Sequence, residues 1–174
     1  YVAQHLVDRY VVGPAALLPP EPELLVLIRD LLLVSIGAHA PGVSMSEFPG
    51  APVIQLRDVT KAALFTGVFF YSSTCDHCHD QMPALRDLYA DLHARGVELL
   101  GVALDTDSSE FATTRSVERL VWPTFTDLIG WGSPVAKAFA VKSTPSFFVI
   151  DRAGRIVAKP FDAAEMRAFL EQRL

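Results

Sequence analysis

The four residues Cys75-Asp76-His77-Cys78 contain the only two cysteines of the chain, and their position constrains the fold more than any other feature. A largely apolar run, 64–71, leads into them, and Met82, Leu85 and Leu88 follow at helical spacing. The pattern predicts a buried strand, a short polar turn, the Cys-x-x-Cys pair and an amphipathic helix, in that order. This context makes a short motif informative.

The expected chemistry follows from that layout. The first turn of a helix offers unpaired backbone N–H groups and the positive end of the helix dipole, which favour a thiolate. We therefore predict that Cys75 is the attacking nucleophile and that Cys78, one turn later, resolves the mixed disulfide. His77 would stabilise the Cys75 thiolate, whereas Asp76 would oppose it. The alternative, a purely structural disulfide, would close a very short loop and remove little unfolded-state entropy.

Length and composition indicate a globular domain with an appendage. The chain has 174 residues, of which 51% are hydrophobic, and a net charge of −5 without a long basic run, so we expect no nucleic-acid partner. The longest membrane-span candidate, 24–36, is short and is interrupted by Arg29 and Asp30. The chain begins at Tyr1 without a signal-peptide pattern, so we expect a signal or an anchor outside it.

Residues 1–35 read as an N-terminal helical segment, and residues 36–174 as the main domain. In the segment, a first helix ends at Gly13-Pro14, and a second from Glu23 to Ile36 is apolar nearly all round, so it should be buried against something. Residues 37–52 read as a loop with at most one short strand, and 58–63 as a turn or a single helical turn. The sequence does not indicate what covers the second helix.

The main domain alternates strands and helices. The sequence predicts strands at 53–56, 64–71, 97–104, 146–150 and 155–159, helices after Cys75 and over 107–120, 133–140 and 162–174, and a loop or short extended stretch at 122–125. The two long apolar strands are joined through a helix, so they should be parallel. The last two strands should form an antiparallel hairpin around Asp151 to Gly154.

This order, with the cysteine pair at a strand–helix junction and Thr144-Pro145 before the penultimate strand, resembles the thioredoxin fold. More narrowly, residues 36–174 resemble the TlpA/ResA-like thiol–disulfide oxidoreductases of bacterial envelopes. Other pieces that match are Gly37 with Ala40-Pro41, Met82-Pro83, and Asp151 with Gly154. The resemblance implies an α/β, thioredoxin-like fold, in which helices flank a central mixed sheet, plus an N-terminal helical segment.

The resemblance also implies functional roles. Pro145 would be a cis-proline beside the disulfide, which leaves the Thr144 backbone available to a substrate chain, and Pro83 would kink the helix. The activity would be disulfide exchange with protein substrates, with an upstream redox partner and no cofactor beyond the Cys75–Cys78 disulfide. The location would be the bacterial envelope, in the periplasm, and membrane anchoring through a preceding region would fit.

Three positions depart from the family pattern. Thr74 replaces the usual Trp before the first cysteine, Gln81 replaces a glutamate near the second, and Phe69 replaces the buried acid of thioredoxins. Both customary proton acceptors are thus missing, and His79 is a candidate substitute because its pKa lies near the working range. We therefore expect slow exchange near neutral pH.

Four alternatives to this activity stay open at this point. Cys75 to His79 match the c-type haem pattern Cys-x-x-Cys-His, with Met45, Met82 or Met166 as the distal ligand. The cysteines with His77 and His79 could also bind a metal, although adjacent helical positions cannot all converge on one ion. A thiol peroxidase would require Pro and Thr where the chain has Val68 and Ser72. The fourth is a non-catalytic binding module with the same fold.

Overall fold

The computed structural model describes residues 22–174, and the first predicted helix lies outside the described residues. The strands are β1 (Ser44–Ser46), β2 (Val53–Gln55), β3 (Phe65–Tyr71), β4 (Val97–Ala103), β5 (Thr124–Phe125), β6 (Ser146–Asp151) and β7 (Ile156–Ala158). The helices are α2 (Pro22–Leu33), α3 (Leu56–Ala62), α4 (Asp76–Leu92), α5 (Ser108–Val117), α6 (Pro134–Ala138) and α7 (Ala163–Glu171), with short 3₁₀ turns η2 (His93–Arg95) and η3 (Gly130–Gly132).

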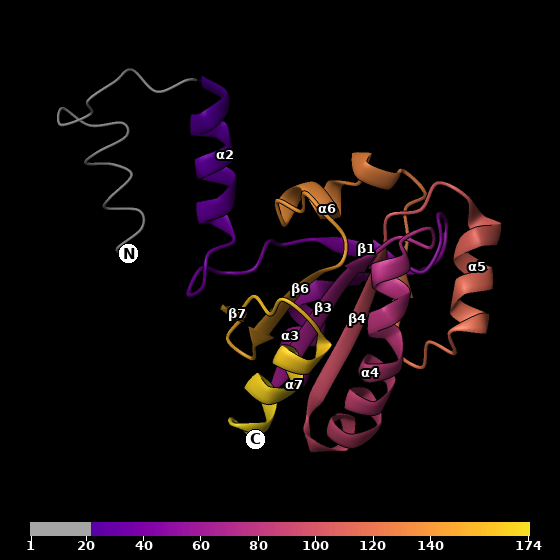
Figure 1. The fold of residues 1–174 in the computed structure, drawn as a ribbon. Coiled ribbons are helices and arrows are strands. Elements are labelled where there is room, and N and C mark those ends of the chain that lie inside the picture. The colour runs from indigo at the N-terminus through magenta and orange to yellow at the C-terminus, as the bar shows by residue number, and fades with distance from the viewer. Residues whose placement is uncertain (1–21) are drawn as a thin grey trace, which may run out of the picture.

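A five-stranded mixed sheet in the order β5-β4-β3-β6-β7 forms the centre of the domain, and helices lie against it (Figure 1). As predicted, β3 and β4 are parallel, in register from Phe65 opposite Val97 to Tyr71 opposite Ala103. The β6–β7 pair is an antiparallel hairpin, also as predicted. The predicted fold class is confirmed. Because parallel strands end at the same edge, the segments after β3 and β4 lie close together there.

Two buried clusters fill the space on the two faces of the sheet. One contains Cys78, Met82 and Leu85 of α4 with Met166 and Leu170 of α7. The other contains Leu56 of α3, Val135 of α6 and alternate side chains of β3 such as Val68 and Phe70. The strands are apolar on both sides because both faces are covered.

Several local elements differ from the prediction. Residues 56–62 form the helix α3, which is longer than the turn or single helical turn predicted at 58–63 and takes in Leu56 from the predicted strand 53–56, because buried Leu56 and Thr60 anchor this segment to the core. Helix α5 ends at Val117, before the predicted end near Leu120, since Arg119 adopts a left-handed φ of 50°. Its N-terminus is as predicted: the Asp107 side chain accepts hydrogen bonds from the backbone N–H groups of Ser109 and Glu110.

Helix α2 ends at Leu33, three residues before the predicted Ile36, and stands away from the sheet in Figure 1. We predicted that its apolar surface would be buried, but Val26 (49%), Leu31 (44%) and Leu33 (60%) are exposed to this extent within residues 22–174. Immediately after it, Val34 is buried in the domain core. No helix in the described part of the chain is long and apolar enough to span a membrane.

Candidate active site

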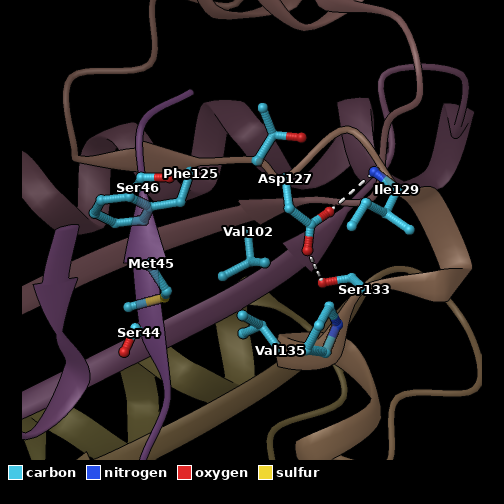
Figure 2. A pocket seen from close by; sticks show the side chains of 11 residues that line it. Ser44, Met45, Ser46, Val102, Phe125, Asp127, Ile129, Ser133 and Val135 are labelled. Carbon is cyan, nitrogen blue, oxygen red and sulfur yellow. Dashed lines mark hydrogen bonds between the residues drawn. The ribbon is translucent and has the colours of Figure 1, made fainter. Parts of the chain in front are cut away.

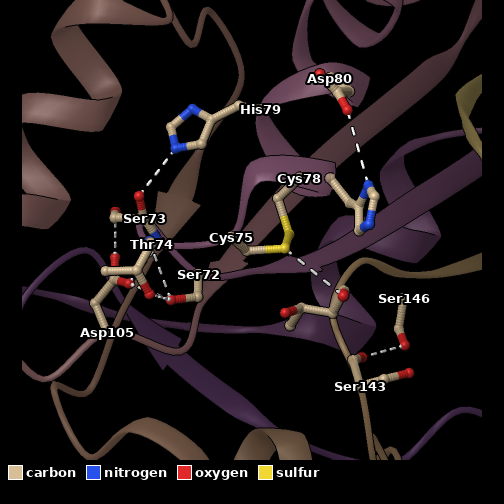
Figure 3. The surroundings of a disulfide bond; sticks show 12 residues. Ser72, Ser73, Thr74, Cys75, Cys78, His79, Asp80, Asp105, Ser143 and Ser146 are labelled. Atoms are coloured by element: carbon tan, nitrogen blue, oxygen red, sulfur yellow. Dashed lines mark hydrogen bonds and ion pairs between the residues drawn. A yellow bond between two sulfur atoms is a disulfide. The ribbon is translucent and has the colours of Figure 1, made fainter.

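The disulfide lies at the edge of the sheet where β3 passes into α4 (Figure 3). Cys75 is the N-cap residue of α4, with an extended backbone (φ −99°, ψ 104°) that turns the chain into the helix. Its carbonyl accepts hydrogen bonds from the backbone N–H groups of Cys78 (2.9 Å) and His79 (3.2 Å). The cysteine Cα atoms are 5.2 Å apart, in the usual range for a disulfide. The predicted strand–turn–helix context of the motif is therefore present.

The two cysteines differ in exposure. Cys78 is 0% exposed and belongs to the same buried cluster as Phe69, Tyr71 and Met82. Cys75 is only partly buried. A substrate sulfur can therefore approach Cys75, whereas Cys78 is covered by the protein. This geometry supports the predicted assignment of attacking and resolving cysteine.

The Thr144–Pro145 segment lies beside Cys75. Its peptide bond is cis, and the Thr144 carbonyl oxygen is 3.6 Å from the Cys75 Sγ atom. The sheet register explains this proximity: Ser146, the first residue of β6, pairs with Phe70 near the end of β3. The segment before β6 and the segment after β3 therefore meet at one edge of the sheet.

Asp105 anchors the segment before the disulfide, and the sequence analysis did not single it out. It is 3% exposed, and its carboxylate accepts hydrogen bonds from the Ser73 N–H (2.7 Å), the Ser73 hydroxyl (2.7 Å) and the Ser72 hydroxyl (3.2 Å). The sequence did contain a signal for this role, because Asp105 comes directly after the apolar run 97–104 that contains β4. In a parallel pair, this position lies next to the residues that follow β3.

His79 forms a second link to the same segment. Its Nε2 atom is 2.9 Å from the Ser73 carbonyl oxygen, and its Nδ1 atom is 2.9 Å from Glu118 Oε1. The backbone hydrogen bond to Ser73 and then the Glu118 carboxylate raise the pKa of His79, while partial burial acts in the opposite direction. Both ring nitrogens are thus engaged away from Cys78. The arrangement does not support the expectation that His79 accepts the Cys78 proton.

His77 lies between the cysteines in sequence but points into solvent. Its side chain is 88% exposed, and its Nδ1 atom is 3.8 Å from an oxygen of Asp80 one turn later. At this exposure, water weakens any effect of its charge on the thiolate. The predicted role of His77 stays a prediction.

Gln81 and Phe69, which stand where the resemblance implies an acid, make other contacts in this structure. Gln81 Oε1 accepts a hydrogen bond from the Ala163 N–H (2.9 Å), so it helps to satisfy the first turn of α7. Phe69 is fully buried and stacks on Tyr71 and Phe147, with ring centroids 5.2 and 5.0 Å apart. Burial, and then the Asp105 carboxylate, raise the pKa of Tyr71 well above its ordinary range. Pro83 lies inside α4.

An open groove of about 760 Å³ runs along the cis-proline segment. It is lined by His77 and Gln81 of α4, by the segment 140–148, and by residues 159–162 before α7. Phe161 is 85% exposed at this groove, which is unusual for a large aromatic side chain. Cys75 does not line the groove, but Thr144, whose carbonyl oxygen lies 3.6 Å from the Cys75 Sγ atom, does.

A second, smaller pocket of about 180 Å³ opens beside β1 (Figure 2). Its lining is mainly apolar and includes Met45, Val102 and Phe125. The Asp127 carboxylate at its rim accepts hydrogen bonds from the Ile129 N–H (3.0 Å) and the Ser133 hydroxyl (2.6 Å). This carboxylate therefore supports the turn before α6, and the residues of the motif do not line the pocket.

Comparisons with known proteins agree with this geometry. The family model described as "AhpC/TSA family" matches residues 36–159. A thiol-disulfide oxidoreductase ResA from Bacillus cereus is 30% identical over 128 residues, covering 72% of this chain and 69% of the relative. A ResA from Halalkalibacterium halodurans is 27% identical, with coverage of 74% and 69%.

Solved structures share the fold. The thioredoxin domain of a thiol-disulfide oxidoreductase from Bacteroides vulgatus has a TM-score of 0.71 at 20% identity, covering 79% of this chain and 96% of that one. A thiol-disulfide oxidoreductase from Bacteroides fragilis has a TM-score of 0.70 at 22% identity, with coverage of 78% and 99%.

Fold, site and family match together place the chain in the AhpC/TSA family of thioredoxin-fold proteins. Within that family it is a ResA-like thiol–disulfide oxidoreductase that carries the Cys75–Cys78 pair.

The structure also bears on the haem, metal-site and thiol peroxidase alternatives. For a haem site, both ring nitrogens of His79 are engaged by protein acceptors, and Met45, Met82 and Met166 are packed in the two cores. Within residues 22–174, no group of three or more His, Cys, Asp or Glu side chains could hold a metal ion. At the peroxidase signature positions, Val68 is buried in the core and the Ser72 hydroxyl donates to Asp105.

Proposed function

We propose that this oxidoreductase exchanges disulfides with extended segments of protein substrates, through attack by Cys75 and resolution by Cys78. The Cys75 thiolate attacks one sulfur of a substrate disulfide, the substrate S–S bond breaks, and the departing sulfur takes a proton. Cys78 then loses its proton and attacks the Cys75 sulfur, which releases the second substrate thiol. Two electrons pass to the substrate, and the Cys75–Cys78 disulfide forms.

One observation carries this proposal: the sulfur at the helix N-terminus is accessible, and its partner is fully buried. An accessible sulfur at the positive end of the α4 dipole is suited to attack. A buried sulfur is protected from outside reagents but lies within reach of a mixed disulfide at Cys75. The order of the two steps follows from this difference.

The Thr144–Pro145 segment supplies the proposed docking edge. A substrate chain that pairs with the backbone at Thr144 would run along the groove and bring its sulfur to Cys75. Backbone pairing depends little on the substrate side chains, so it suits a reductase or oxidase with several protein substrates. Phe161 at the groove would contact apolar side chains of the substrate.

Other residues have supporting roles in this proposal. His77 adds positive charge near the thiolate when it is protonated, and Pro83 alters α4 one turn after the resolving cysteine. Gln81 keeps α7 docked on α4 but cannot accept a proton. Cys78 would then lose its proton without help from residue 81, which makes the resolving step slow near neutral pH.

We further propose that residues 36–174 form the catalytic domain and that residues 1–35 are an N-terminal appendage, which Val34 ties to the domain core. The family match begins at residue 36, which supports the division. The resemblance to envelope oxidoreductases supports a bacterial extracytoplasmic location, where an upstream redox partner would reset the disulfide. Anchoring through a region before Tyr1 is compatible with this location.

Trapping of mixed disulfides tests the proposal. Reduced Cys78→Ser protein should accumulate covalent adducts with disulfide-containing proteins, while Cys75→Ser and the double variant should accumulate none. Non-reducing gels with mass mapping identify the sulfur involved. Adducts through Cys78 in the Cys75→Ser variant, with none in Cys78→Ser, would reverse the assignment.

A further inference from the structure

His79 has no part in the exchange steps above, yet its imidazole connects α4 with the segment before the disulfide (Figure 3). Its two ring nitrogens each lie 2.9 Å from an oxygen, one on the Ser73 carbonyl and one on the Glu118 carboxylate. A carbonyl and an ionised carboxylate only accept hydrogen bonds, so with Glu118 ionised both nitrogens donate. Only the imidazolium form has two N–H donors, so this pair of acceptors favours the His79 cation.

Charged groups from several elements surround this imidazolium. Glu118 approaches from the end of α5, and it is held in turn by Arg86 of α4, which donates to the Glu118 carbonyl and lies 3.7 Å from its carboxylate. Asp76 in the first turn of α4 also favours the cation. Behind Ser73, the Asp105 carboxylate comes from the end of β4. Glu118 and Asp76 therefore favour the charge on His79, while Asp105 fixes Ser73, the residue whose carbonyl His79 contacts.

These contacts fix the backbone that presents the attacking sulfur. Ser73 is held on one side by the buried Asp105 and on the other by His79. Ser72, its neighbour, accepts the backbone hydrogen bond of Cys75 (3.1 Å). The His79 backbone N–H also donates to the Cys75 carbonyl. The orientation of Cys75 at the start of α4 therefore depends on a segment that His79 ties down.

We propose that His79, as an imidazolium, is a positioning residue for disulfide exchange: by holding the Ser73 carbonyl it keeps Cys75 at the helix N-terminus, where the thiolate is favoured. This inference rests on the proposed role of Cys75 as the attacking thiol. It assigns to the residue after the motif a positioning role for Cys75 in place of proton transfer. When His79 loses its proton, one of the two hydrogen bonds must be lost, and the segment before Cys75 loosens.

The test measures how the reactivity of Cys75 depends on pH. In a Cys78→Ser background, Cys75 is the only thiol, and its rate of reaction with iodoacetamide reports its thiolate fraction. The variants are His79→Leu, which removes both donors, and Glu118→Gln, which keeps an acceptor oxygen but removes the charge. His93→Gln is the matched control, because His93 lies at the far end of the same helix and contacts the Val97 carbonyl (3.2 Å).

With His79→Leu, we expect the pKa of Cys75 to rise by about half a unit, which slows the reaction near about pH 6 roughly threefold. The plateau rate above about pH 9.5 should stay unchanged, because the thiol is ionised there in every variant. Glu118→Gln should shift the profile in the same direction by less. His93→Gln should reproduce the profile of the background protein.

A lower melting temperature of His79→Leu with an unchanged Cys75 profile would show a merely structural role and overturn the proposal. If His79→Leu does not fold, Glu118→Gln decides: a shifted profile supports the proposal, and an unchanged profile overturns it. An NMR titration adds a direct check, because the pKa of His79 should lie above about 6.5 and fall in Glu118→Gln. Failure of the proposed function would show separately, as an absence of trapped substrate adducts.

Discussion

Cys75 and Cys78 belong to one disulfide but lie in opposite surroundings. The Cys75 side is polar: Ser72 and Ser73 are hydrogen-bonded to a buried aspartate, and a histidine holds the same segment from the helix. The Cys78 side is apolar, and its cluster includes the stacked rings of Phe69 and Tyr71.

The difference separates two requirements of dithiol exchange. The attacking sulfur needs a fixed position and a favoured thiolate, which hydrogen bonds and the helix dipole provide. The resolving sulfur needs protection until the mixed disulfide has formed, which burial provides. Burial in general disfavours a charged sulfur, so we expect the second step to be the slower one.

The largest expected effect comes from removing either sulfur. Cys75→Ser should abolish reduction of a protein disulfide such as insulin, because no accessible sulfur is left to attack the substrate disulfide. Cys78→Ser should also stop turnover but should retain the first half of the reaction. Turnover assays and trapping of one equivalent of substrate separate the two, and equal trapping by both variants would contradict the comparison.

Removing the polar anchor should cost stability. Asp105→Ala leaves the two hydroxyls and the N–H that it binds without their acceptor, and we expect a loss of about 2–4 kcal/mol in the free energy of unfolding. Asp107→Ala is the matched control, since it removes an exposed N-cap, and it should lower the free energy of unfolding by less than Asp105→Ala does. Urea denaturation measures both, and a larger loss for Asp107→Ala would argue against Asp105 as the anchor.

A carboxylate placed near Cys78 should speed the resolving step and so reduce the difference between the two cysteines. Gln81→Glu should accelerate the resolving step about tenfold to a hundredfold near neutral pH, at the low end for a general base because the α7 N-terminus stabilises the anion. Gln81→Leu is the control: it loses the bond to Ala163 without gaining a base, so it should destabilise but not accelerate. Single-turnover rates across pH decide, and identical profiles for Gln81→Glu and the unaltered protein would show that residue 81 lies outside the chemistry.

A smaller effect should appear in the pH dependence of stability. Because the folded-state pKa of His79 is raised, its contribution is fully present below the unfolded pKa of about 6.5 and is lost as pH rises through the folded pKa. The melting temperature of the unaltered protein should exceed that of His79→Gln by about 1–3 °C in acid, and the gap should close in alkali. A difference in melting temperature that grows as the pH rises would contradict this prediction.

Hydrophobic spacing and turn residues in the sequence predicted most of the fold, but they did not predict the contacts between distant segments. The apolar strands, the parallel β3–β4 pair and the β6–β7 hairpin follow from hydrophobic spacing and turn residues. The burial difference between the cysteines follows from their places on α4, one at its start and one a turn later.

The sequence did not indicate the duties of Asp105, Glu118 and Gln81, because each side chain meets a group far along the chain. Asp105 reaches a segment 32 residues earlier, and Gln81 reaches one 82 residues later. Such pairs depend on register and helix placement, which local spacing does not define. The partners of His79 explain why a plausible proton acceptor in sequence is a hydrogen-bond donor in the structure.

Competitive labelling tests the central claim, the difference between the two sulfurs, most directly. The fully reduced protein is treated with less than one equivalent of iodoacetamide near about pH 7, and the labelled cysteine is identified by peptide mass mapping. The account predicts that label on Cys75 exceeds label on Cys78 by about tenfold or more, because Cys78 is buried and its thiolate is disfavoured. Equal labelling, or a preference for Cys78, would contradict it.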